Sequence, residues 1–291
     1  MKGIYSTKKI IHRSEALVTI QKNTAFALTR DNTKLHYTLH SGEKRGCPRI
    51  VLVHSLAMDG EFWNPVVDLL TPFADVLTYD CRGHGKSDKP SGPYSIPQFA
   101  DDLHDLLQHL EWSSAAVAGA SMGGAVALGF AINYPQQTHG LGLLDTTAWY
   151  GADAPKNWAE RAAKARAEGM QALLPFQKTR WFCEEFQEQH PEVLEKCIDV
   201  FLKNEIHAFD ATCHMLGGFD LRSGLANIKT KTAIAVGEED YATPIAMAEI
   251  LHESIKDSTL EVLPKARHLT PLECPEKIAD ILKNILQDIR S

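Results

Sequence analysis

The chain has 291 residues, of which 44% are hydrophobic and 23% charged, and its formal net charge is −7. These values are typical of a globular protein with a sizeable core, and the negative charge argues against nucleic acid as a partner. No stretch approaches 18 uninterrupted apolar residues, so we expect no membrane span.

Six cysteines are spread along the chain without a C-x-x-C pair, which argues against a zinc site or a redox motif. The N-terminus is basic, but His12 and Arg13 interrupt its short apolar run, so it is not typical of a secretory signal. We therefore expect reduced thiols, a cytoplasmic location, no metal and no cofactor.

Strand patterns begin after residues 1–23, which we interpret as an N-terminal arm. Segments 24–30 and 34–40 flank the turn pair Asp31-Asn32 and predict a hairpin. Short apolar runs, as expected for strands buried on both faces, follow at 49–54, 75–79, 114–119, 140–145, 232–237 and 258–263.

Helical patterns lie between these runs, most clearly at 97–112, where Ser95 and Gln98 have the spacing of a capping box. This alternation indicates a mostly parallel sheet covered by helices on both faces. It stops after Asp145.

From about Trp149 to Arg222 only helix-like segments occur, most clearly at 156–170 and 191–204. We therefore predict one core, residues 24–147 and 228–291, with a helical cap inserted at 148–227.

The segment Gly119-Ala120-Ser121-Met122-Gly123 has the pattern G-x-S-x-G between a predicted strand and a predicted helix. A serine on such a sharp turn is held in a strained conformation that exposes its Oγ. The following amide, on Met122, points from a helix N-terminus toward developing negative charge. Ser121 is the predicted nucleophile, and Met122 supplies one predicted oxyanion donor.

A serine nucleophile needs a histidine to take its proton and a carboxylate to orient that histidine. With a strand–serine–helix turn, the chain order is Ser, acid, His. His268 follows the last predicted strand by five residues and is the predicted base; its rival, His252, falls within a helical pattern. Asp240, after strand 232–237, is the predicted acid, and Asp145 remains an alternative.

The loop after strand 49–54 reads His54-Ser55-Leu56-Ala57, and we expect the Leu56 N–H to be the second oxyanion donor. Ser55 stands where many hydrolases have glycine. Asp80 and Arg82 are interpreted as structural residues that brace a turn. The candidates for contact with a substrate are Ser55, Trp149, Trp158, Trp181 and Met215.

Taken together, five segments resemble the α/β-hydrolase superfamily: 54–59, 79–87, 119–124, 237–244 and 267–269. Within it, the chain most resembles the 3-oxoadipate enol-lactone hydrolase group, through Ser55-Leu56, Gly92-Pro93-Tyr94, Arg180-Trp181-Phe182 and segment 219–222. The resemblance implies an α/β-hydrolase fold with an eight-stranded sheet. It also implies a serine hydrolase that cleaves a small carboxylic ester or lactone through an acyl-enzyme.

One departure concerns the substrate. The group tends to have an arginine shortly after the sixth strand, where this chain has only Thr146 to Tyr150. A missing cation would weaken recognition of a carboxylated lactone. Another carboxylesterase, a carbon–carbon bond hydrolase and a ligand-binding signalling receptor remain alternatives. A small-molecule ester or lactone is the expected partner, with no membrane; homo-oligomer formation stays open.

Overall fold

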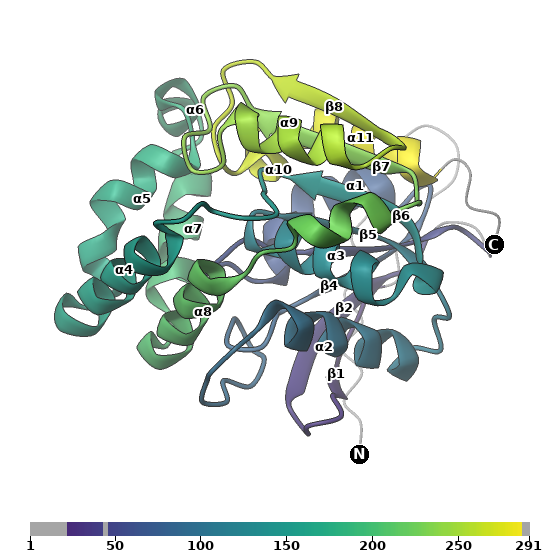
Figure 1. Cartoon of the computed structure of the whole chain (residues 1–291), viewed down its shortest axis with the longest axis horizontal. Helices are drawn as coiled ribbons and strands as arrows, with labels where there is room; N and C mark the ends of the chain where they lie inside the picture. Colours follow the sequence, from purple (N-terminus) through teal and green to yellow (C-terminus); the bar gives the residue numbers. More distant parts are fainter. Residues whose placement is uncertain (1–21, 43–45, 287–291) are drawn as a thin grey trace.

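The computed structural model of the protein describes residues 22–42 and 46–286 (Figure 1). Their strands form one sheet in the order β1-β2-β4-β3-β5-β6-β7-β8. β2 is antiparallel to both neighbours, and all other neighbours pair in parallel. The strands are β1 (Lys22–Leu28), β2 (Lys34–His40), β3 (Arg49–Val53), β4 (Asp75–Tyr79), β5 (Ala115–Ala120), β6 (Thr138–Leu144), β7 (Thr232–Gly237) and β8 (Ser258–Leu263).

This sheet confirms the predicted fold class, and most of its strands begin and end within one residue of the predicted runs. The first hairpin differs: β1 begins at Lys22, inside the predicted arm, and ends at Leu28. Its end is set by Thr29, whose Oγ1 accepts from the Thr33 N–H at 3.0 Å and so belongs to the turn. The rest of the predicted arm, residues 1–21, lies outside the described residues.

Two helix pairs cover the sheet, one on each face (Figure 1). α2 packs against α3, and α1 packs against α11. The predicted N-terminal capping bond of α2 is present, since Ser95 Oγ accepts from the Gln98 N–H at 3.3 Å. The helices of the core are α1 (Asn64–Leu70), α2 (Ile96–His109), α3 (Met122–Asn133), α9 (Ile245–Ser254), α10 (Thr270–Glu273) and α11 (Pro275–Leu286), with short 3₁₀ turns η1 (Gly60–Trp63) and η2 (Pro135–Gln137).

Between β6 and β7 the chain forms a separate helical layer at one side of the core (Figure 1). Its α4 and α8 pack against each other, and α4 buries Ala154, Ala162 and Ala165 along one stripe. The layer contains α4 (Ala154–Glu168), η3 (Met170–Leu173), α5 (Leu174–Trp181), α6 (Glu184–Gln189), α7 (Pro191–Leu202), α8 (Ile206–Gly218) and η4 (Arg222–Asn227). We call this layer the cap; the exact boundaries 148 and 227 stay a prediction.

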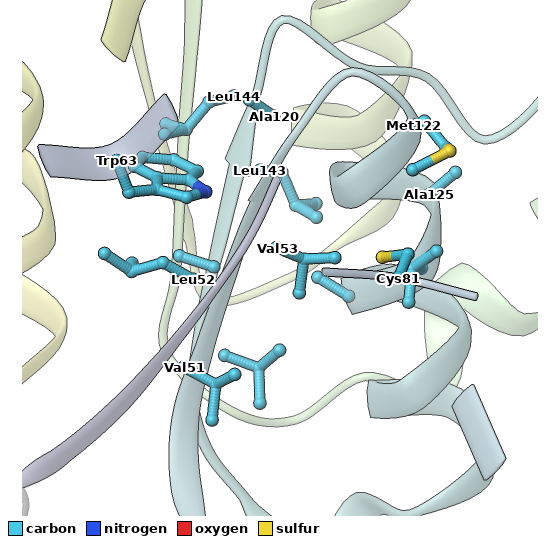
Figure 2. Close-up of a cluster of buried hydrophobic side chains, with 14 of the residues drawn as sticks. Val51, Leu52, Val53, Trp63, Cys81, Ala120, Met122, Ala125, Leu143 and Leu144 are labelled. Atoms are coloured by element: carbon cyan, nitrogen blue, oxygen red, sulfur yellow. The ribbon is translucent and has the colours of Figure 1, made fainter. Parts of the chain in front are cut away.

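The central strands place their side chains alternately on the two faces of the sheet. Figure 2 shows Leu52 of β3 beside Trp63, whereas Val53 lies with Leu143 toward Met122. All five side chains are buried, and Met122 is the first residue of α3. The turn that leads into α3 is therefore packed on buried apolar side chains.

Within the described ranges, no helix is long and apolar enough to cross a membrane.

Candidate active site

Ser121 occupies a strained turn between β5 and α3. Its backbone has φ 54° and ψ −115°, in the left-handed half of conformational space that side chains rarely adopt. Glycine at two flanking positions makes the close approach possible. A Cβ on Gly119 would lie 2.0 Å from the Gly123 oxygen, and one on Gly123 would lie 2.1 Å from the Val53 oxygen. The turn thus projects Ser121 at the end of the sheet.

His268 and Asp240 reach the serine from two neighbouring loops of the core. His268 Nε2 lies 2.8 Å from Ser121 Oγ, and His268 Nδ1 lies 2.8 Å from Asp240 Oδ2. The structure therefore brings together the three residues predicted from the sequence. This arrangement allows the imidazole to take the serine proton while the carboxylate fixes the tautomer of the ring.

The Asp240 carboxylate is fixed by its own loop. Its Oδ1 accepts from the N–H groups of Ala242 and Thr243, and its Oδ2 accepts from the Thr243 hydroxyl at 2.8 Å. Burial by itself would raise the pKa of Asp240. The facing His268 and the bonds from Thr243 outweigh burial, so the pKa is lowered. Asp240 is therefore ionised when the enzyme works, as the orienting residue must be.

Asp145, the alternative acid, is fully buried but does not contact the histidine. It accepts hydrogen bonds from the Gly237 N–H and from both the N–H and the hydroxyl of Thr270. Burial and the nearby Asp240 charge raise its pKa well above the usual range. Its bonds hold the ends of the acid loop and the base loop together, which is a positioning role.

The loop after β3 covers the turn from the other side. The N–H groups of Leu56 and Met122 donate to no acceptor among the described residues, as expected for a pair of oxyanion donors. The positive φ of this loop falls on Ala57, at 60°, and not at the Ser55 position where glycine is usual. Asn204 of the cap donates to the Ala57 carbonyl at 2.9 Å. Both oxyanion assignments remain predictions.

Backbone bonds join the cap to the base loop. The Arg180 carbonyl accepts from the His268 N–H at 3.2 Å, and the Trp181 carbonyl accepts from the Leu269 N–H at 3.1 Å. The C-terminal end of α5 therefore helps to position the imidazole. The Arg180 side chain lines the cavity described next.

A cavity of about 560 Å³ lies where the cap meets the core beside these loops. Its lining comes from the β6–α4 loop, α4, η3 and α5, and from Ala242 and Met247 of the core. Arg161 and Arg180 both line it, together with Tyr150, Trp158 and Phe176. The size is in the usual range for a small-molecule site.

Of the predicted substrate contacts, only Trp158 lines this cavity. Trp181 and Met215 are buried in the packing of the cap, where Trp181 meets Phe201 edge-on at 5.5 Å. Trp149 lies under the Arg222 guanidinium, 3.7 Å from its ring centre. None of these three side chains lines this cavity, because large side chains at helical spacing fill a core as readily as they line a pocket. As substrate contacts they stay predictions.

Ser55 is also buried away from the cavity. Its carbonyl accepts from His54 Nδ1 at 2.8 Å and from the Met58 N–H at 3.1 Å. It therefore shapes the oxyanion loop. The bracing role expected for Asp80 is present, because its carboxylate accepts from the N–H groups of Gly60 and Lys86 at 2.7 Å each.

The two cavity arginines have no carboxylate partner in the described parts of the chain. The Nε atoms of Arg161 and Arg180 are buried without a hydrogen bond, and Arg161 has one bond, to Gln177 Oε1 at 2.5 Å. Burial, and then the facing Arg180, lower the pKa of Arg161 to about 10; burial also lowers the pKa of Arg180. Neither arginine was among the substrate contacts predicted from the sequence.

A signal for Arg161 was present in the sequence. It lies three residues after Trp158 and one before Ala162, on the stripe that α4 turns inward. A charged residue on such a stripe is either paired or functional. Tyr150 and Arg180 gave no such signal, since one lies in a loop and the other at a helix end.

A sequence model of the alpha/beta hydrolase family matches residues 50–281. The chain belongs to this family. It is 30% identical to 3-oxoadipate enol-lactonase 2 of Acinetobacter baylyi over 260 residues, which cover 89% of this chain and 96% of the relative. The reaction class is thereby confirmed: this α/β hydrolase is a hydrolase of carboxylic esters or lactones.

Solved structures agree. The enol-lactonase from Burkholderia xenovorans superposes with a TM-score of 0.86 at 33% identity, covering 91% of this chain and all of that one. A thermophilic esterase from Thermogutta terrifontis with malate bound gives a TM-score of 0.85 at 28% identity, covering 92% and 100%. The predicted resemblance to enol-lactone hydrolases is confirmed as well.

Proposed function

We propose that this α/β hydrolase opens a small lactone or ester that carries a carboxylate, through an acyl-enzyme on Ser121. One observation carries the proposal: a cavity beside the Ser121–His268–Asp240 constellation contains two buried guanidinium groups without a carboxylate partner in the described residues. The constellation supplies the chemistry, and the cavity selects the substrate.

The reaction proceeds in two halves. Ser121 Oγ attacks the carbonyl while His268 takes its proton, and the N–H groups of Leu56 and Met122 hold the resulting oxyanion. His268 then gives the proton to the leaving oxygen, which departs as an alcohol or enol. The same imidazole next activates a water molecule that releases the acid from Ser121.

The anion site follows from the cost of burying charge. Burial lowers the pKa of both guanidinium groups, and the Arg180 charge lowers that of Arg161 further, whereas the Asp240 charge acts on Arg180 in the opposite direction. Neither guanidinium makes a hydrogen bond or ion pair to a carboxylate of the described chain. Each has an aromatic face beneath it, Trp158 and Phe209 for Arg161 and Phe176 for Arg180, which supports the cations only weakly. A carboxylate in the cavity would pair with both and complete their hydrogen bonds.

The relatives support the same substrate class. The Acinetobacter relatives are named as lactonases of 3-oxoadipate enol-lactone, which is a carboxylated lactone. The similar esterase has malate bound, which is a dicarboxylate. The arginine absent after β6 is thus compensated by two arginines from α4 and α5. A cytoplasmic location belongs to the proposal, supported by the buried free thiols of Cys81, Cys197 and Cys213.

A matched pair of lactones tests the proposal. We would compare (5-oxotetrahydrofuran-2-yl)acetate with its carboxamide, which has nearly the same shape but no charge, using wild type and Ser121→Ala. We expect kcat/KM to be about 10–100 times higher for the carboxylate, the value of one or two charged hydrogen bonds, and no turnover by Ser121→Ala. Equal turnover of both lactones would rule out a carboxylate-binding site in the cavity. Turnover by Ser121→Ala would rule out an acyl-enzyme on Ser121.

A further inference from the structure

The end of α5 is completed by the base loop, residues 265–269. Carbonyl groups in the last turn of a helix have no partner within the helix and need a donor from outside it. As described above, the last two carbonyls of α5 accept from backbone N–H groups of the base loop. The Thr179 carbonyl, one residue earlier, accepts from the side chain of Arg267 at 2.9 Å. The residue before the predicted base therefore completes a turn of the cap.

The Arg267 guanidinium lies across the junction of α5 and α6. The Nη1 that donates to Thr179 also donates to the Phe182 carbonyl at 3.3 Å. A cation at the C-terminal end of a helix is favourable, because the helix dipole is negative there. Arg267 Nε also lies 3.4 Å from Glu239 Oε2 of the acid loop, but Glu239 is 47% exposed, and such pairs contribute little. The bonds that matter most therefore go to the cap.

Glu273, the last residue of α10, fixes the same junction from the other side. Its Oε2 accepts from the Arg267 N–H at 2.7 Å, and its Oε1 accepts from the Cys183 N–H at 2.8 Å. One carboxylate thus binds the backbone of the base loop and the backbone of the cap. Arg267 and Glu273 together tie residues 179–183 of the cap to the start of the base loop.

The imidazole depends on this connection for its position. His268 makes two contacts of 2.8 Å at once, to Ser121 Oγ and to Asp240 Oδ2. Asp240 is fixed by the N–H groups of its own loop, whereas the His268 N–H is bonded to the end of α5. Misplacement of a reacting group by about 1 Å can cost about 10²-fold in rate. A shift of α5 would therefore be felt at the base.

We propose that Arg267 is a positioning residue for the hydrolytic reaction. By completing the end of α5, its side chain holds the base loop against the cap and keeps the His268 imidazole within reach of both Ser121 and Asp240. Arg267 itself takes no proton and binds no substrate. The cap thereby contributes to proton transfer at Ser121 as well as to the walls of the cavity. This role rests on the proposed acyl-enzyme mechanism.

Arg267→Met tests the role, because methionine is a long side chain without a hydrogen-bond donor. A fluorophosphonate that reacts with Ser121 separates positioning from folding. The final amount of label counts the folded sites, whereas the rate constant of labelling depends on activation of Ser121 by His268. We expect as much label as in wild type, with a rate constant about 10–100-fold lower. For p-nitrophenyl acetate, kcat/KM per labelled site should fall by the same factor.

The matched control is Lys265→Met, in the same loop. Lys265 Nζ also faces the cap, 3.9 Å from Glu185 Oε2, but this pair is exposed and lies at α6 and not at the end of α5. Exposed ion pairs contribute little to stability. Both the amount of label and the rate constant of labelling should therefore stay within about twofold of wild type.

Glu273→Gln is a second, milder variant. Its amide has one acceptor oxygen, so one of the two N–H groups loses its acceptor. We expect the rate constant of labelling to fall about 3–10-fold with the amount of label unchanged.

A normal rate constant in Arg267→Met, however small the labelled fraction, would assign Arg267 to stability alone and overturn the proposal. An equal loss in Lys265→Met would also overturn it. If Arg267→Met yields no folded protein, a normal rate constant in Glu273→Gln would decide against the proposal. Failure of the proposed function itself would appear separately, as wild type in which Ser121 is not labelled.

Discussion

Buried arginines are treated differently in the core and in the cap. In the core, Arg82 is 2% exposed and donates to Asp102 through Nε and Nη2 and to Asp31 through Nη1. In the cap, Arg161 and Arg180 meet no carboxylate of the described residues. We infer that a buried arginine paired with carboxylates of the chain stabilises the fold. A buried arginine without such a partner is available to bind a carboxylate of the substrate.

The largest effect is expected in the core, at the orienting acid. Asp240→Asn should lower kcat by about 10⁴-fold, because an amide favours the wrong tautomer of His268. The free energy of unfolding should change little, and far-ultraviolet circular dichroism with a thermal melt would check it.

Asp145→Asn is the matched control for that substitution. Its φ of 48° suits asparagine, but the amide group cannot accept all three bonds from Gly237 and Thr270. We expect a loss of stability of about 1–3 kcal/mol with kcat reduced less than about tenfold. A 10⁴-fold loss of kcat in Asp145→Asn, and not in Asp240→Asn, would exchange the two roles.

Next in size is the core arginine. Arg82→Met leaves the Asp102 carboxylate buried without its partner, which should cost about 3–5 kcal/mol of unfolding free energy. The kinetic constants of the folded fraction should stay within about twofold of wild type. Denaturant titration measures the first quantity. A stable Arg82→Met variant would show that a partner does not distinguish structural arginines from functional ones.

The cap arginine should show the reverse pattern. Arg180→Met should raise KM for the carboxylated lactone about 10–100-fold and leave the carboxamide unaffected. Stability should not fall, since no carboxylate loses a partner.

Arg222→Met provides the control, because Arg222 also covers an aromatic ring, Trp149, but lies outside the cavity lining. If Arg180→Met changed both lactones equally, the side chain would position the cap and not the substrate.

The difference between the core and the cap also explains which features could be predicted from the sequence. The strand runs and the positions of Ser121, Asp240 and His268 were visible because a parallel sheet brings the ends of its strands to one edge, so that spacing from a strand end becomes a position in space. The small residues around Ser121 are required by backbone contacts of about 2 Å that no side chain could enter.

The cap offered no such reference. Trp158 and Trp181 look alike in sequence, yet one lines the cavity and the other is buried against Phe201. Which face of a short helix meets a cavity depends on tertiary packing, and no local pattern records it.

The proposed mechanism depends most directly on Ser121 being the residue that is acylated. A fluorophosphonate that labels activated serines, followed by intact-mass and peptide mass spectrometry, measures this in one step. We predict a single adduct on the peptide that contains Ser121, and none in Ser121→Ala. An adduct on another residue, or an unlabelled wild type that still hydrolyses esters, would contradict an acyl-enzyme on Ser121.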